Sequence, residues 1–225
     1  MRKIWLLALA AALCGCQQKE TSPPVEQPIR LPSAPSPTPS SDTRPVIACF
    51  GDSLTAGLGL DPGQSFPDLI QHELDARGYR YRVVNLGVSG DTTEDGLARM
   101  GMVLAEKPAI VVLEFGANDG LRGQPVPHIQ GSLAQMIETF EKAGAGVLLA
   151  GITLPPNYGA AYIGNFDAMY RRLASQYKLP LIPFLLADVA GNPRLMQRDG
   201  MHPNAEGARI VTATVWRALQ PMLQR

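Results

Sequence analysis

The sequence predicts an α/β fold of three layers, in which helices cover both faces of a central parallel sheet of about five strands. Two observations support this prediction. Short apolar runs alternate along residues 46–225 with longer stretches of helical spacing, as in repeated crossover units. The apolar runs are also almost continuous, as in strands that are buried on both faces. We find no internal repeat and no membrane-spanning run in residues 46–225, so we expect a single domain there.

Residues 1–15 are predicted to be a signal peptide. Met1–Lys3 carry positive charge, and Ile4–Leu13 form an apolar run that is short for a membrane-spanning helix. The run ends in the letters LCGC. Small residues before a cysteine resemble the lipobox of bacterial lipoproteins, in which Cys16 would carry the lipid after cleavage behind Gly15. The alternative is an ordinary secretory signal that contains a cysteine by chance.

Residues 16–45 are predicted to be a disordered tether behind the lipidated cysteine. They are rich in proline, serine and threonine and contain almost no large apolar residue. Such a segment cannot bury enough surface to offset its ordering entropy, and proline favours extended spacers. We therefore expect a lipid-anchored protein of the bacterial cell envelope. Inner-membrane lipoproteins often have aspartate directly after the lipidated cysteine, but this chain has Gln17 there. This favours anchoring in the outer membrane, with the domain facing the periplasm.

The strands and helices of residues 46–225 follow from apolar patterning. Five β-rich runs are expected as strands: Val46–Phe50, Arg82–Leu86, Ile110–Phe115, Gly146–Ala150 and Leu181–Phe184. Helical spacing is found over residues 66–77, 129–140, 165–177 and about 205–222. Cys49 lies inside the first strand, so we expect a small buried side chain there and no disulfide.

Polar or glycine-rich turns follow the predicted strands. In order along the chain they read GDSLTAG, GVSGDTT, GANDGLRG, ITLPPNYG and RDGMHPN. In open parallel sheets, ligands bind beyond the carboxyl ends of the strands. These turns therefore predict a functional site at that edge of the sheet.

Ser53 and His202 are the candidate nucleophile and base. A serine near neutral pH needs a base, and the base needs an orienting group. Asp199 stands three residues before His202 and is the candidate for that group. A polar turn that caps the last helix, with Asn204 as the cap, is the alternative for this segment. The other histidines of the domain lie in or beside predicted helices, where surface roles are expected.

Three groups are candidate donors to an oxyanion: the backbone N–H of Ser53, the backbone N–H of Gly90 and the side-chain amide of Asn118. Ser53 is expected to begin a helix, whose N-terminus favours negative charge. Glycine allows close approach of the backbone at Gly90. Taken singly, a turn glycine explains Gly90 better and an Asx turn or cap explains Asn118 better, but the occurrence of all three groups at successive strand ends favours an oxyanion hole. Asp52 and Asp119 are expected to tie their turns together through backbone hydrogen bonds.

Composition excludes several classes of partner and cofactor. The formal net charge of the chain is +0, which gives no support to nucleic-acid binding. No metal-ligand spacing and no phosphate-binding glycine loop occurs. We therefore expect no cofactor and no metal, a small-molecule substrate and a monomeric protein.

Four short motifs give the sequence a specific resemblance. GDSL at Gly51–Leu54, SGDT at Ser89–Thr92, GAND at Gly116–Asp119 and DGMH at Asp199–His202 resemble, in order, the four blocks of the SGNH or GDSL hydrolases. The segments GANDGLRG and LPPNYG further resemble the branch known as arylesterase, thioesterase I or lysophospholipase.

The resemblance implies a flavodoxin-like fold and a cofactor-free serine esterase. It implies Ser53, Asp199 and His202 as the triad, and Ser53, Gly90 and Asn118 as the oxyanion hole. It also implies that the loop over residues 154–166 lines an acyl pocket, with Leu154, Tyr158 and Tyr162 in contact with substrate; a plain connecting loop is the alternative. The implied substrates are aryl or short-to-medium acyl esters, with lysophospholipids and acyl thioesters as further possibilities.

Two other functions fit the sequence less well. One is an O-deacetylase of envelope carbohydrate, although the sequence lacks a long aromatic-rich groove segment. The other belongs to a different class, a non-catalytic lipoprotein that binds the envelope. Retention of every block residue, Ser53 and His202 included, argues against the second.

Overall fold

The fold is organised around a five-stranded parallel sheet, as the sequence predicts. The computed structural model describes residues 42–224, so the predicted signal peptide, Cys16 and most of the tether lie outside the described residues. The sheet has the order β2-β1-β3-β4-β5, and every neighbouring pair is parallel. Its strands are β1 (Val46–Gly51), β2 (Arg82–Gly87), β3 (Ile110–Glu114), β4 (Gly146–Ala150) and β5 (Leu181–Ile182).

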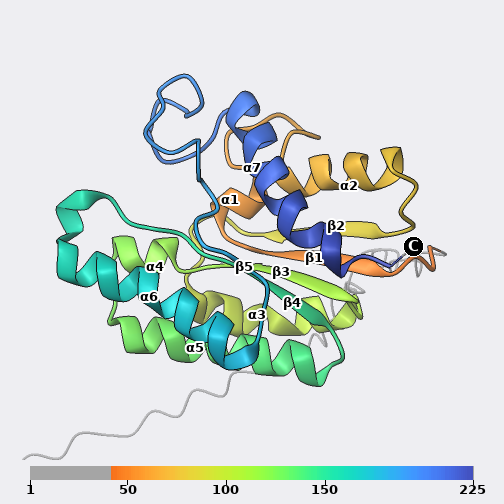
Figure 1. Ribbon diagram of the computed structural model, residues 1–225, viewed down its shortest axis with the longest axis horizontal. Coiled ribbons are helices and arrows are strands. Elements are labelled where there is room, and N and C mark those ends of the chain that lie inside the picture. Colours follow the sequence, from red (N-terminus) through yellow and green to blue (C-terminus); the bar gives the residue numbers. More distant parts are fainter. Residues whose placement is uncertain (1–41, 225) are drawn as a thin grey trace, which may run out of the picture. The chain divides into compact units, whose positions relative to one another are not determined.

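Helices cover both faces of this sheet (Figure 1). One face carries α2 and α7, with the short α1 at its edge, and the other carries the helices from α3 to α6. The bounds are α1 (Ser53–Ala56), α2 (Phe66–Ala76), α3 (Thr93–Ala105), α4 (Ala117–Leu121), α5 (Val126–Lys142), α6 (Ala160–Tyr177) and α7 (Ala205–Leu219). The 3₁₀ turns η1 (Pro156–Tyr158) and η2 (Gln220–Met222) complete the set. None of the helices in the described part of the chain is both long and apolar enough to cross a bilayer.

The boundaries differ from the predicted ones where backbone chemistry intervenes. Strand β5 ends at Ile182, two residues early, because Pro183 has no N–H to continue a ladder. Helix α6 begins at Ala160, five residues early, directly after Gly159 with a φ of 83°. Helix α3 was not predicted, although Thr92 and Asp95 form a capping box at its start.

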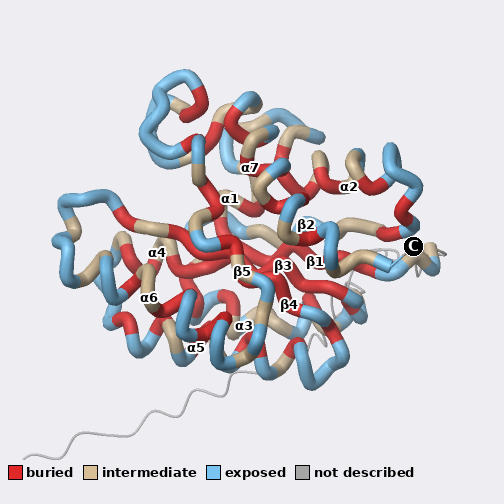
Figure 2. The backbone as a smooth tube through the Cα atoms, viewed as in Figure 1, coloured by how far each residue is buried: buried red, intermediate tan, exposed pale blue. Residues whose placement is uncertain are grey.

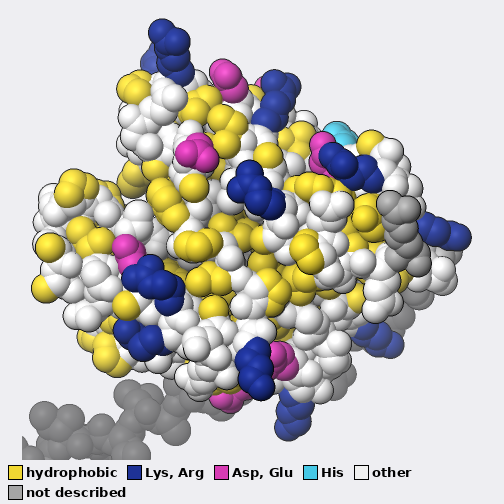
Figure 3. Space-filling view, in the orientation of Figure 1, with side chains coloured by type: hydrophobic (Ala, Val, Ile, Leu, Met, Phe, Trp, Pro, Cys, Tyr) yellow, Lys and Arg dark blue, Asp and Glu magenta, His cyan; other side chains and the backbone are white. Residues whose placement is uncertain are grey.

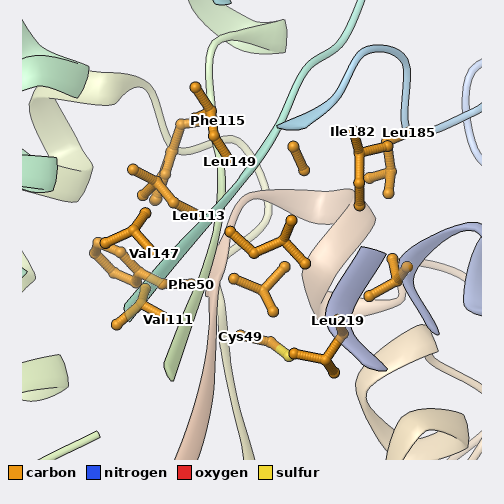
Figure 4. Packing of buried hydrophobic residues seen from close by; sticks show 14 of the residues in the cluster. Cys49, Phe50, Val111, Leu113, Phe115, Val147, Leu149, Ile182, Leu185 and Leu219 are labelled. Atoms are coloured by element: carbon orange, nitrogen blue, oxygen red, sulfur yellow. The ribbon is translucent and has the colours of Figure 1, made fainter. Parts of the chain in front are cut away.

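The core lies on both faces of the sheet. Every residue of β1 is buried, and the buried parts of the chain follow the strands through the centre of the molecule (Figure 2). Phe50 packs on one side of the strands with Val111 and Leu113, whereas Cys49 lies on the other side beside Leu219 of α7 (Figure 4). Burial raises the pKa of the Cys49 thiol far above its usual value, so this cysteine behaves as the small buried side chain that was predicted.

A long segment without helices or strands separates β5 from α7. Residues 183–204 form turns and bends, and a single antiparallel bridge between Met196 and Pro203 holds their second half. The segment leaves the carboxyl end of β5 and returns beside α1, where it brings Asp199 and His202 to the same edge of the sheet as the ends of β1 and β3 (Figure 1).

Candidate active site

The candidate nucleophile sits on a tight turn at the end of β1. The Asp52 side chain caps α1 by accepting from the Leu54 N–H at 3.0 Å, as predicted, and Ser53 is the first residue of that helix. Gly57 ends α1 after a single turn with a φ of 77°. A helix of one turn aligns few peptide dipoles, so the N-terminus of α1 supplies less positive potential than that of a longer helix would.

Ser53, His202 and Asp199 form a continuous hydrogen-bonded relay. Ser53 Oγ lies 2.8 Å from His202 Nε2, and His202 Nδ1 lies 2.7 Å from Asp199 Oδ2. With its proton on Nδ1, the imidazole leaves Nε2 free to accept from the serine hydroxyl. The Asp199 side chain is 38% exposed and that of His202 only 14%, so the relay runs inward from the surface.

The second Asp199 oxygen fixes the loop that carries the relay. Asp199 Oδ1 accepts from the backbone N–H groups of Met201 at 2.9 Å and His202 at 3.0 Å. Burial raises the pKa of Asp199, but the hydrogen bonds from His202 and the two backbone N–H groups outweigh it and lower the pKa to about 2. The carboxylate is therefore ionised throughout the neutral range. Asn204 also caps α7, so both interpretations of this segment hold together.

Gln197 joins the base loop to the nucleophile turn. Its Nε2 donates to the Leu58 carbonyl at 2.6 Å, just beyond α1, and to the Pro203 carbonyl at 2.9 Å. Its backbone N–H donates to the His202 carbonyl at 2.7 Å. One side chain thus spans the two segments that must stay in register for the serine to meet the imidazole.

Asn118 and Gly90 lie together on the wall of the same cleft. The Asn118 Nδ2 donates to the Asp91 carbonyl at 2.9 Å and, more loosely, to Asp52 Oδ2 at 3.2 Å. Gly90 has a φ of 90°, and its carbonyl accepts from the Arg122 guanidinium at 3.1 Å. The loop after β2 is therefore held to α4 from two sides.

Two charged side chains, the buried Asp119 and the half-buried Arg99, fix that loop further. The Asp119 carboxyl accepts from the N–H of Thr93 at 2.9 Å and from the Thr93 hydroxyl at 2.6 Å. It therefore anchors the start of α3, whereas the sequence predicted that it would tie its own turn together. Arg99 of α3 pairs with Asp91 at 2.5 Å and donates to the Gly51 carbonyl at 2.8 Å. These contacts tie the ends of β1 and β2 to α3.

A second carboxyl group lies buried behind the nucleophile turn. Glu114 ends β3 opposite Gly51, and a Cβ added at Gly51 would collide with it. Glu114 Oε2 accepts from the Asp52 N–H at 3.2 Å and from the Thr55 hydroxyl at 2.8 Å. Asp52 and Glu114 are both almost completely buried, and this burial raises the pKa of each carboxyl group.

A cleft of about 590 Å³ opens beside the relay. Figure 3 shows the outline hollowed between the segment before α7 and the segment before α6, with hydrophobic side chains on both sides. Ser53, Gly90, Asn118 and His202 all border the cleft. The rest of its lining is mainly apolar and includes Leu58, Leu121, Ile152, Leu154, Phe184 and Met201. The volume suits a drug-sized or acyl-chain ligand.

The structure brings Leu154 to this cleft but not the two tyrosines expected beside it. Tyr158 donates its hydroxyl to the Leu121 carbonyl at 2.9 Å, and Tyr162 donates to the Gln124 carbonyl at 2.5 Å. Neither tyrosine is among the described residues that border the cleft. Tyr158 fastens the segment before α6 to the end of α4, and Tyr162 fastens the first turn of α6 to the loop after α4, so both support the cleft wall from behind.

Sequence reasoning missed Glu114 and Gln197. A carboxylate at the end of an otherwise apolar buried strand is uncommon, and this signal could have singled out Glu114. No pattern marks Gln197, because its two carbonyl partners come from segments far apart in the chain.

Comparison with known proteins gives this arrangement a family. A model described as the GDSL-like Lipase/Acylhydrolase family matches residues 49–210. Esterase TesA of Pseudomonas aeruginosa is 48% identical over 179 residues, which cover 79% of this chain and 89% of the relative. Thioesterase 1/protease 1/lysophospholipase L1 of Escherichia coli K12 is 37% identical over 179 residues, 79% of this chain and 85% of the relative. A crystal structure of TesA has a TM-score of 0.77 at 47% identity and covers 79% of this chain and 99% of that one. The chain therefore belongs to the GDSL-like lipase/acylhydrolase family.

Proposed function

We propose that this ester hydrolase cleaves aryl and short-to-medium acyl esters through an acyl intermediate on Ser53. His202 takes the serine proton as the hydroxyl attacks the substrate carbonyl, and Asp199 holds the imidazole and stabilises its charge. His202 then gives that proton to the leaving alcohol. Water attacks the acyl-enzyme in the same way and releases the acid.

The observation that carries this proposal is the relay from Ser53 through His202 to Asp199, at 2.8 and 2.7 Å, at the mouth of an apolar cleft. Acyl esters, lysophospholipids and acyl thioesters are the substrate classes that the names of the relatives indicate. A cleft of about 590 Å³ with an apolar lining supports an acyl chain better than an acetyl group.

A chain-length series of p-nitrophenyl esters tests the proposal on the purified protein and its Ser53→Ala variant. We expect serine-dependent turnover that rises with chain length until the cleft is filled. Acetate release from O-acetylated glycans, without hydrolysis of longer esters, would instead identify a deacetylase. Folded protein with no turnover and no capture of a fluorophosphonate would favour a binding role.

Asn118→Ala tests the proposed oxyanion hole, which Asn118 forms with the N–H groups of Ser53 and Gly90. We expect kcat to fall by about 10²–10³-fold with little change in KM, because the amide acts on charge that develops in the transition state. Steady-state kinetics on a soluble aryl ester measure both constants. A rise in KM alone would assign Asn118 to ground-state binding.

The envelope location is also a proposal, supported by the sequence of residues 1–45. A lipid on Cys16 would anchor the protein, and the tether over residues 16–45 would hold the hydrolase domain off the membrane. Radiolabelled palmitate should be incorporated by the full chain and not by Cys16→Ser. Equal incorporation into both would contradict the anchor, and absence of label from both would favour an ordinary secretory signal.

A further inference from the structure

Two buried carboxyl groups, those of Asp52 and Glu114, lie behind the nucleophile and hold one proton between them. Asp52 and Glu114 are 0% and 1% exposed, and Glu114 Oε2 accepts from the backbone N–H of Asp52 at 3.2 Å. Two neighbouring carboxyl groups that are buried this deeply do not both ionise, so one of them keeps a proton. Which carboxyl holds this proton decides where the negative charge lies.

The hydrogen-bond donors around the pair locate the proton. Each oxygen of Asp52 faces an N–H donor, from Leu54 at 3.0 Å and from Asn118 at 3.2 Å. Both donors to Glu114, the Asp52 N–H and the Thr55 hydroxyl, reach Oε2. Glu114 Oε1 is buried without such a donor. An oxygen in that position satisfies itself by carrying the proton and donating it.

We infer that Glu114 is a positioning residue: it stays a neutral acid and keeps Asp52 an anion, which, beside the Asp91 carbonyl, holds the Asn118 amide in the orientation that makes Nδ2 the oxyanion donor. An anionic Asp52 can only accept, as the Asp91 carbonyl does, so both select the amide orientation in which Nδ2 faces them. If the proton moved to Asp52, that carboxyl could donate to the Asn118 carbonyl oxygen. A flipped amide would give up its bond to the Asp91 carbonyl and present its oxygen, and not its N–H, to a developing oxyanion.

The surroundings of the pair agree with this placement. Burial and the charge of Asp52 raise the pKa of Glu114 well above its usual value. Burial also raises the pKa of Asp52, but the bonds from Leu54 and Glu114 and the field of His202 oppose that rise, while the charge of Asp119 adds to it. Tyr170 of α6 donates to the carbonyl of Phe115, the residue after Glu114, at 2.9 Å, and Arg99 donates to the neighbouring Gly51 carbonyl at 2.8 Å.

The inference rests on the proposed role of Asn118 for its effect on catalysis, but the protonation of Glu114 can be measured without turnover. Infrared spectroscopy of the substrate-free enzyme should show a protonated-carboxyl C=O band at neutral and mildly alkaline pH, and Glu114→Gln should remove it. A parent enzyme without this band, or a band that Glu114→Gln leaves unchanged, would overturn the inference.

Two substitutions then test the positioning effect. Glu114→Gln keeps a donor toward Asp52 and an acceptor for Thr55, so we expect kcat within about tenfold of the parent. Asp52→Asn can donate to the Asn118 carbonyl oxygen, so we expect kcat to fall about 10²-fold at unchanged KM. The same change should cost little more in an Asn118→Ala background, because both act through one amide.

Other patterns contradict the positioning role. A loss in Glu114→Gln as large as that in Asp52→Asn would mean that a charged Glu114 is needed. Additive losses in the Asp52→Asn/Asn118→Ala double variant would mean that Asp52 acts elsewhere. If no variant or parent hydrolyses esters, the proposed function fails, and the infrared band still decides the protonation of Glu114.

Discussion

Ser53→Ala should abolish ester hydrolysis and leave the fold intact. The Ser53 hydroxyl lies 2.8 Å from His202 Nε2 and is the group that would form the acyl intermediate. Loss of the nucleophile from a serine relay costs on the order of 10⁶-fold in kcat in a well-studied protease, and we expect at least about 10⁴-fold here. The fold should persist because Asp52, and not Ser53, caps α1.

The measurement combines turnover of a p-nitrophenyl ester with mass spectrometry after exposure to a fluorophosphonate. The parent should gain the mass of one phosphonyl group at Ser53, and Ser53→Ala should gain none. Ser175→Ala, an exposed position on α6, is a matched control that should behave as the parent does. Full turnover by Ser53→Ala would show that another group attacks the substrate.

Asp199→Asn should lower kcat by about 10⁴-fold, the effect that the same change has in a serine protease triad. The amide can still accept from the Met201 and His202 N–H groups, so the loop should keep its shape. Its NH₂ group would, however, face His202 Nδ1, which must then accept. The proton moves to Nε2, and the imidazole can no longer take the proton of Ser53.

The dependence of kcat on pH separates the loss of the correct His202 tautomer from a change in the structure of the loop. Because the folded pKa of Asp199 is about 2, below its usual value, its carboxylate stays charged until the pH falls through that range. Protonation of Asp199 therefore does not cause a loss of activity in mild acid. Asp188→Asn, in the same irregular segment, is the matched control and should retain the parent profile. Retained activity in Asp199→Asn would remove Asp199 from the relay.

The sequence was sufficient to predict the architecture and the relay. Apolar runs identified all five strands, and those of β1, β3 and β4 are almost continuous because these strands are covered on both faces. The relay was predictable because the chemistry demands serine, histidine and a carboxylate, and parallel strands bring their carboxyl ends to one edge.

The sequence did not predict the direction in which individual side chains point. Tyr158 and Tyr162 were expected to face substrate, but they donate to carbonyls at the end of α4 and in the loop after it. Glu114 and Gln197 act on neighbours that only the folded chain brings near. Periodicity gives the face of an element on which a side chain lies, but not the atom that it meets.

The relay also joins the earliest strand of the domain to the last loop before its final helix. Ser53 and His202 are 149 positions apart, with four of the five strands completed between the first and the second. During synthesis, the serine would leave the ribosome long before any base exists to activate it. An unfinished or truncated chain would thus carry only an ordinary alcohol. Ester hydrolysis therefore reports that the whole domain has folded, from its first strand to its last loop.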